Sequence, residues 1–263
     1  MLGKKQSISN DDWIEAMANI ESLVSFQELK QLEEKTIADI QSVTYGKKVA
    51  YAWSAGKDSI VLGKVCEKAG IKDCFIGMSN LEYTDFVKWV HENKPLNCEV
   101  INTGQDLEWL SKNQKMLFPQ KSEIASKWFS IVQHTAQRQY FNKHNLDMII
   151  LGRRRADGNY IGKGQNFYTD GKGVTRYSPI AYWRHEDILA YIHYYNLPLP
   201  PIYSWKNGYK CGTHSWAARQ HTGSVQNGWQ EVYDIEKQIV INASNYIQSA
   251  KDFLTTGGQN ANS

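Results

Sequence analysis

The residues best suited to chemistry are residues 54–59, which read SAGKDS. They follow a short apolar run at 49–53 and precede a pattern in which apolar residues share one face of a helix. A glycine-containing turn between a buried strand and a helix exposes backbone N–H groups and the positive helix end, which together bind phosphate. Gly56 lets the backbone approach a ligand closely, and Lys57 adds a positive charge. The sequence therefore predicts a phosphate-binding loop.

The remaining polar side chains of this loop have different expected roles. The hydroxyls of Ser54 and Ser59 are suited to donating hydrogen bonds to phosphate oxygens. Asp58 repels phosphate, so we expect it either to cap the helix or to help hold a magnesium ion. Asp58 is thus the candidate metal ligand.

A second group of candidates is the run of three arginines, Arg153 to Arg155, which follows Gly152 at the end of the strand-like run 148–151. Ligands of open parallel sheets bind outside the carboxyl ends of the strands. Arg153 and Arg154 are therefore candidates for clamping a phosphate or sulfate through two hydrogen bonds. The alternative is a solvated basic turn, and Arg155 is the arginine that we most expect to be merely exposed.

The elements that must position these residues alternate between strand and helix. Such alternation predicts an α/β fold with a parallel sheet of about five strands covered by helices. Glycines recur from 157 to 173, which suits a mobile loop over a site. The expected strands are 49–53, 74–78, 98–101 and 148–151, and the expected helices are 60–69, 84–93 (capped by Thr84), 122–144 and 185–195.

Helical periodicity at both ends of the chain predicts helical extensions. Apolar residues recur at helical spacing from 10 to 40, which indicates one or two amphipathic helices, and again from 229 to 254, which indicates one long helix. We therefore divide the chain into an N-terminal helical extension (1–45), a central domain (46–216), and a C-terminal helix with its tail (217–263). The terminal helices are the expected contact surface for a homodimer or a complex partner.

Composition excludes several classes of protein. The 263 residues include 30 basic and 27 acidic ones, so the net charge of +3 gives no strong signal for nucleic acid or a membrane as partner. No apolar run approaches the roughly 20 residues of a membrane helix, and the first residues lack a secretory signal, so we expect a cytoplasmic protein. The four cysteines form no CxxC pair or Cys/His cluster, so neither zinc nor an iron–sulfur cluster is expected.

The spacing of the phosphate loop distinguishes between nucleotide-binding families. It is not the GxxxxGK[ST] loop of common NTPases, because no glycine precedes Gly56 at the required offset. It resembles the SGGxDS loop of the adenine nucleotide α-hydrolase superfamily, the PP-loop ATP pyrophosphatases, with Ala55 where glycine is common. Members of that superfamily cleave ATP between the α and β phosphates. The resemblance implies that ATP, with magnesium, binds this loop, and that residues 46–216 form a PP-loop domain.

From about Lys47 to Trp216 the chain also resembles the phosphoadenosine phosphosulfate reductase family. The resemblance rests on segments in the family's order and spacing: SNLEY at 79–83, LGRR at 151–154, YSPIAYW at 177–183, EDI at 186–188, and NLP at 196–198 with Pro201 and Tyr203. We therefore expect the nucleotide-binding residues to be Ser54, Ala55, Gly56, Lys57, Asp58, Ser59, Met78, Gly152, Arg153 and Arg154.

That family contains reductases, which attack a sulfonucleotide with a cysteine, and enzymes that use ATP. The reductases typically lack the loop lysine, whereas Lys57 is present here. The segment 210–214, KCGTH, echoes the reductases' Glu-Cys-Gly-x-His motif but has lysine in place of glutamate. Lys210 and His214 are expected to lower the pKa of Cys211 if it is the nucleophile of a reductase. The alternative is a structural loop cysteine.

The leading hypothesis is an ATP pyrophosphatase or adenylyltransferase. Lys57 and Arg153 are the predicted catalytic residues, which neutralise the departing phosphates while an unknown acceptor attacks the α phosphorus. No dedicated general base is identified, although His134 and His214 are candidates. Two alternatives stay open: a sulfonucleotide reductase that uses Cys211, and a non-catalytic nucleotide sensor within a larger complex.

Overall fold

The structure is a computed structural model that describes residues 2, 7–164 and 166–257. Its centre is a six-stranded sheet of order β3-β2-β1-β4-β6-β5. All neighbouring strands are parallel except β5 and β6, which form an antiparallel hairpin at one edge. This confirms the predicted α/β fold. The hairpin, which begins in the glycine-rich segment and ends just after it, supplies the strands that the sequence did not show. The strands are β1 (Val49–Ala52), β2 (Cys74–Met78), β3 (Cys98–Asn102), β4 (Met148–Ile150), β5 (Phe167–Thr169) and β6 (Thr175–Tyr177).

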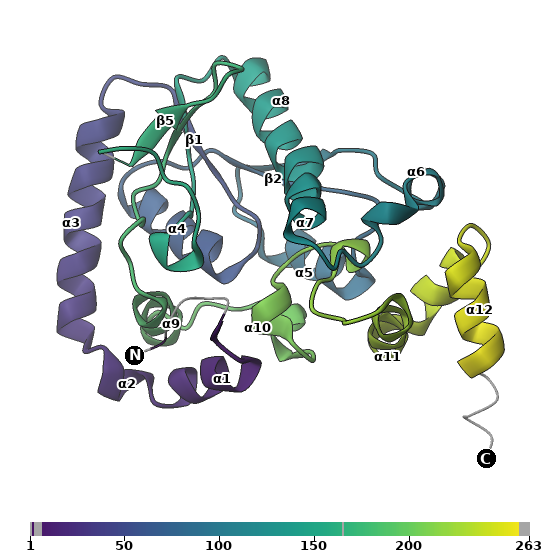
Figure 1. Ribbon diagram of the computed structural model, residues 1–263. Coiled ribbons are helices and arrows are strands. Elements are labelled where there is room, and N and C mark those ends of the chain that lie inside the picture. Colours follow the sequence, from purple (N-terminus) through teal and green to yellow (C-terminus); the bar gives the residue numbers. More distant parts are fainter. Residues whose placement is uncertain (1, 3–6, 165, 258–263) are drawn as a thin grey trace.

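Helices cover both faces of this sheet, as Figure 1 shows. Side chains alternate between the two faces of a strand. Tyr51 and Ile150 belong to the core shared with α4 (Lys57–Lys68), whereas Ala50 and Ile149 belong to the core shared with α8 (Thr135–His144). Burial on both faces explains why the central strands are short apolar runs. The remaining helices of this domain are α5 (Thr84–Asn93), α6 (Leu107–Lys112), α7 (Ser122–Phe129), α9 (His185–Tyr194) and α10 (Gly208–Cys211).

The helix predicted over 122–144 is interrupted. A π-helical turn, Ser130–His134, separates α7 from α8. This turn and the start of α8 pass so close to β2 that a Cβ on Gly77 would lie 3.2 Å from the carbonyl oxygen of Val132 and 2.6 Å from the Cβ of Ala136. Apolar periodicity cannot show such a turn, which is common at functional sites.

The N-terminal extension contains three helices in place of the predicted one or two: α1 (Asn10–Ala18), α2 (Ile20–Leu23) and α3 (Phe26–Thr44). Capping boxes at Ser9 and Ser25 begin α1 and α3. The helix α3 packs on α4 and α9, and α1 packs on α9 and α10.

The C-terminal segment forms two packed helices, α11 (Val225–Ala243) and α12 (Gln248–Gly257), where one was predicted. The backbone of Glu236 breaks the helical geometry inside α11. Its carboxylate accepts hydrogen bonds from the backbone N–H and the hydroxyl of Thr84, so Glu236, and not Thr84, supplies the side-chain acceptor at the start of α5. The part of the predicted tail after residue 257 lies outside the described residues.

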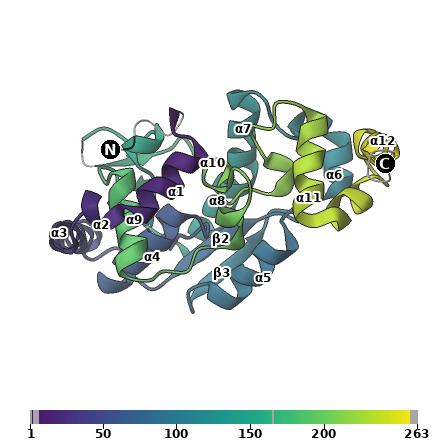
Figure 2. The same ribbon diagram turned by 90° about the horizontal axis from the view of Figure 1, so that it is seen from below.

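The two extensions lie apart from each other. Figure 2 shows α3 at one end of the molecule and α12 at the other, in agreement with Figure 1. None of the helices in the described part of the chain is long and apolar enough to cross a membrane.

Candidate active site

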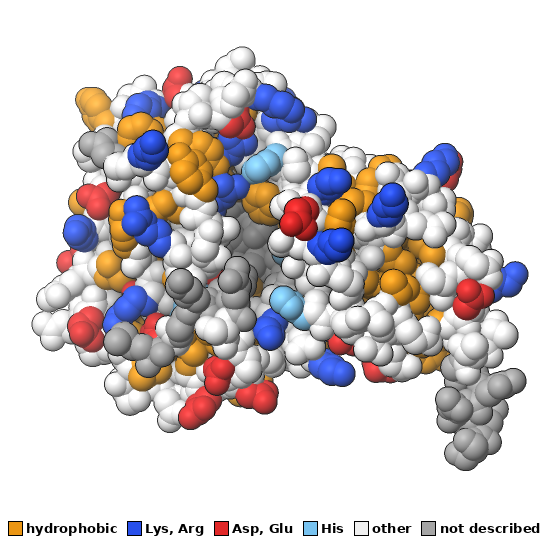
Figure 3. Space-filling view, viewed as in Figure 1, with side chains coloured by type: hydrophobic (Ala, Val, Ile, Leu, Met, Phe, Trp, Pro, Cys, Tyr) orange, Lys and Arg blue, Asp and Glu red, His pale blue; other side chains and the backbone are white. Residues whose placement is uncertain are grey.

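A cavity of about 260 Å³ opens at the carboxyl ends of β1 and β4. This is close to the lower end, about 300 Å³, of the usual range for small-molecule sites. Figure 3 shows the hollow in this face of the molecule, with basic and histidine side chains near it. The structure brings most of the predicted site residues to this cavity: its lining includes Ser54, Gly56, Lys57, Asp58, Ser59, Gly152 and Arg153.

The phosphate loop holds a strained and internally braced conformation. Ala55 is fully buried with a positive φ of 56°, which explains why this position commonly carries glycine in the loops that this one resembles. The Ser59 hydroxyl donates to the Gly56 carbonyl and accepts from the backbone N–H of Ser54. The Thr213 hydroxyl donates to the Ser54 carbonyl at 2.9 Å, which ties the loop to the segment after α10. In this arrangement, the Ser59 hydroxyl donates to the backbone and not to a ligand.

Lys57, the first residue of α4, is only 2% exposed although it lines the cavity. Its ammonium lies 2.7 Å from Oδ2 of Asp58 and 4.8 Å from the ring centroid of Trp13. Oδ1 of Asp58 accepts a hydrogen bond from Nε of Arg154 at 2.8 Å. Asp58 therefore bridges two cations at the base of the loop.

This bridge bears on the predicted magnesium ligand. Both carboxylate oxygens of Asp58 already face cations, so the arrangement does not fit Asp58 as a metal ligand. Within the part of the chain that the structure describes, no group of three or more His, Cys, Asp or Glu side chains is placed to hold a metal ion.

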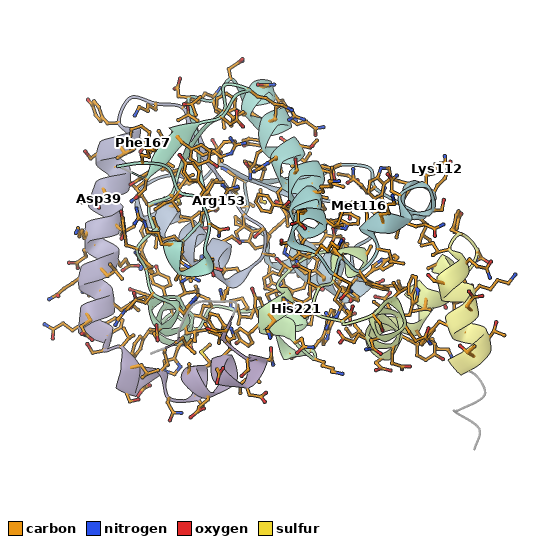
Figure 4. The ribbon with its side chains drawn as sticks, viewed as in Figure 1. Asp39, Lys112, Met116, Arg153, Phe167 and His221 are labelled. Carbon is orange, nitrogen blue, oxygen red and sulfur yellow. The ribbon has the colours of Figure 1, made fainter. Side chains whose placement is uncertain are left out.

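The three arginines after β4 take three different positions. Arg154 is fully buried beneath the loop, where it is paired with Asp58 and Asp157. Arg153 lines the cavity near the middle of the molecule (Figure 4). Arg155 is exposed, as expected, with its guanidinium 4.8 Å from the ring centroid of Tyr182.

Neutral histidines hold both inner arginines. Nη2 of Arg153 lies 3.0 Å from Nε2 of His134, and Nη1 donates to the Tyr168 hydroxyl at 2.6 Å. Nη2 of Arg154 lies 3.1 Å from Nδ1 of His185. Burial, reinforced by the neighbouring arginine, lowers the pKa of each histidine to about 4. Each imidazole is therefore neutral near pH 7 and can accept a hydrogen bond from its arginine.

Cys211 lies apart from the cavity. Its side chain is 5% exposed, and its Sγ donates to the Gln220 carbonyl at 3.5 Å. Burial raises the pKa of this thiol, with Arg219 as the main opposing charge. The lowered thiol pKa expected from Lys210 and His214 is therefore not found: Lys210 does act in that direction, but burial outweighs it.

Three predicted binding residues also stand back from the cavity: Arg154, which lies buried beneath the loop, Met78 and Ala55. Met78 is buried at the end of β2, and its carbonyl accepts a hydrogen bond from the backbone N–H of Thr103. Ala55 contributes the backbone turn described above. The side chains of Met78, Ala55 and Cys211 are absent from the cavity's lining.

The sequence reasoning missed Glu82 as a site residue. A notch of about 20 Å³ adjoins the cavity and shares Ser54, Gln133 and His214 with its lining. The carboxyl of Glu82 lines this notch, and Oε1 accepts hydrogen bonds from the backbone N–H and the hydroxyl of Ser79. Burial raises the pKa of Glu82 to about 7. Its only signal in the sequence was its position in the segment SNLEY, directly after a predicted strand.

Comparison with known proteins places this site in a family. The sequence profile of the phosphoadenosine phosphosulfate reductase domain matches residues 48–234, which include the phosphate loop, the arginines and Cys211. The chain belongs to this family. The match begins after α3, so the N-terminal extension lies outside the family's common domain. No curated protein sequence shows significant similarity to the chain.

The chain is also similar to several solved structures. A phosphoadenylyl-sulfate reductase from Candida auris, in a phosphate complex, is 12% identical over 69% of this chain and 92% of its own, with a TM-score of 0.48. An NH3-dependent NAD synthetase from Campylobacter jejuni, in complex with nitrate, is 14% identical over 86% and 96%, with a TM-score of 0.45. An NMN synthetase from Francisella tularensis is 17% identical over 65% and 71%, with a TM-score of 0.42.

Proposed function

We propose that this protein binds ATP in the cavity and cleaves it between the α and β phosphates, transferring the adenylyl group to an acceptor. The observation that carries the proposal is the arrangement of charge. Lys57 and Arg153 line the same cavity as the phosphate loop, while the thiol of Cys211 lies outside it. This arrangement of positive charge supports a polyphosphate as the ligand and offers no thiolate to it.

In the proposed reaction, a nucleophilic atom of the acceptor forms a bond to the α phosphorus. The bond between that phosphorus and the oxygen bridging to the β phosphate breaks, and pyrophosphate leaves with the electron pair. Negative charge grows on the leaving group, and positive groups fixed beside it stabilise the transition state. Lys57 and Arg153 are the groups that perform this task.

Asp58 and Arg154 make Lys57 available for this role. The ammonium of Lys57 is paired with Asp58, which also accepts from the buried Arg154. Lys57 can therefore turn toward a phosphate oxygen while Arg154 continues to neutralise Asp58. The neutral His134 orients Arg153 without cancelling its charge.

The reductase alternative rests on membership of a family named for that reaction. It requires a thiolate that reaches the sulfur of a sulfonucleotide. The thiol of Cys211 is buried, and burial raises its pKa, so the reactive form is suppressed. This observation favours ATP over the sulfonucleotide.

The test measures the two candidate reactions in separate assays. The purified protein is supplied with magnesium and ATP in one assay, and with phosphoadenosine phosphosulfate and reduced thioredoxin in another. We expect pyrophosphate to be released from ATP when an acceptor is supplied as a small-molecule extract, and we expect this release to survive in Cys211→Ser. Sulfite production that disappears in Cys211→Ser would establish the reductase in its place.

A further inference from the structure

The N-terminal extension reaches into the active site through one residue, Trp13. Trp13 lies on α1 and is fully buried, and its ring centroid is 4.8 Å from Nζ of Lys57. The ring stacks on Tyr209, with centroids 5.7 Å apart and an interplanar angle of 9°. Its edge contact with His185 has a centroid distance of 4.7 Å. Trp13 is therefore held on two sides while it faces the lysine of the phosphate loop.

The position of α1 is itself fixed by its surroundings. Oδ1 of Asn10, the first residue of α1, accepts a hydrogen bond from the backbone N–H of Tyr209 at 3.0 Å. The capping box of Ser9 fixes the start of the helix. The contact between Trp13 and Lys57 thus belongs to a packed assembly of α1, α9, α10 and the phosphate loop.

The electrostatics of Lys57 explain what this contact does. A lysine that is 2% exposed has lost most of its hydration. Asp58, its carboxylate partner, is shared with Arg154. The face of an indole ring attracts a cation, more strongly when the cation is desolvated. Because the ring carries no net charge, it holds the ammonium in place without neutralising it for an incoming phosphate.

We infer that Trp13 is a positioning residue for Lys57, so that the N-terminal extension forms part of the active site of this chain. The family profile starts at residue 48, so this device is an addition to the common domain. The inference rests on the proposed function in one respect: ATP is taken as the ligand that Lys57 contacts.

The test compares ATP affinity, measured by titration calorimetry with MgATP, among variants of the full chain. Trp13→Leu removes the aromatic face, and Trp13→Phe keeps a weaker one. Since a desolvated cation–π contact contributes about 2 kcal/mol, we expect Trp13→Leu to weaken ATP binding by up to roughly 30-fold and Trp13→Phe by a few-fold.

The matched control is Trp229→Leu. Trp229 is also fully buried, but it packs against Phe118 and Trp216 and not against the phosphate loop. We expect this variant to lose stability while the dissociation constant for ATP stays unchanged. A loss of affinity in Trp229→Leu equal to that in Trp13→Leu would show a general effect of core damage and would overturn the inference.

A double-mutant cycle separates the inference from the proposed function. If Trp13 acts through Lys57, adding Trp13→Leu to Lys57→Met weakens ATP binding no further. The same four proteins are also unfolded in urea, where a direct contact makes the two destabilisations non-additive. If the wild-type protein does not bind ATP, the proposed function fails, and the urea cycle still decides the inference. The inference would be overturned if Trp13→Leu bound ATP as tightly as the wild type, or if the two destabilisations were additive. If Trp13→Leu does not fold, wild-type affinity for ATP in Trp13→Phe would overturn the inference.

Discussion

Replacing Lys57 by methionine removes an ammonium from the phosphate cavity while keeping the length of a buried side chain. A hydrogen bond between a protein group and a charged partner contributes about 1.5–3 kcal/mol. Solvent screens this one little, because Lys57 is only 2% exposed. We therefore expect Lys57→Met to weaken ATP binding by about 10- to 150-fold.

The effect of Lys57→Met on folding should be smaller than its effect on binding. The variant leaves Oδ2 of Asp58 without its lysine, but the side chain of Asp58 is 23% exposed and keeps its pair with Arg154. Calorimetric titration with MgATP gives the affinity, and thermal unfolding gives the stability. Lys64→Met is the matched control, since Lys64 lies on the same helix in an exposed pair with Glu67. An affinity of Lys57→Met equal to that of Lys64→Met would refute the role assigned to the lysine.

Three further predictions concern the groups around the cavity. Arg154→Met should lower the free energy of unfolding in urea by about 3–5 kcal/mol, because it breaks buried ion pairs with Asp58 and Asp157. Lys112→Met, which breaks an exposed pair, should change the free energy of unfolding far less. Burial raises the pKa of Glu82 to about 7, so a negative charge appears beside the cavity as the pH rises through 7. ATP affinity should therefore fall over that pH range in the wild type and fall less in Glu82→Gln. Parallel profiles of affinity against pH for the two proteins would contradict this. Burial lowers the pKa of His185 from 6.5 to about 4, so between these pH values the unfolded chain takes up a proton that the folded chain does not. The free energy of unfolding should therefore fall as the pH falls from 6.5 to 4. This fall should be less steep in His185→Asn.

Local patterns in the sequence were sufficient to predict the phosphate loop and the sheet that carries it. The change from an apolar run to SAGKDS and then to helical periodicity marks a strand, a turn and a helix over about 20 residues. Arg153 and Arg154 were predicted to bind an anion from their place after a strand, and the structure brings Arg153 to the cavity but not Arg154. The different positions of the two arginines were not predictable, because packing decides that Arg154 lies under the loop and that Arg153 lines the cavity.

The missed features depend on contacts between distant segments. Trp13 precedes Lys57 by more than 40 residues, and its spacing on α1 marks only a buried helix face. The pKa of Glu82 follows from burial in the folded protein. The pKa of Cys211 also follows from burial, which outweighs the lowering effects of Arg219, Gln220 and the adjacent Lys210.

The measurement that tests the central claim most directly is the fate of ATP labelled at the α phosphate. The protein is incubated with the labelled ATP, magnesium and a small-molecule extract as the source of acceptors, and the products are separated by chromatography. Cleavage between the α and β phosphates predicts that the label appears in AMP or an adenylated product, with an equal amount of pyrophosphate, and that Lys57→Met suppresses both. Label in ADP would show cleavage between the β and γ phosphates and would contradict the proposed reaction.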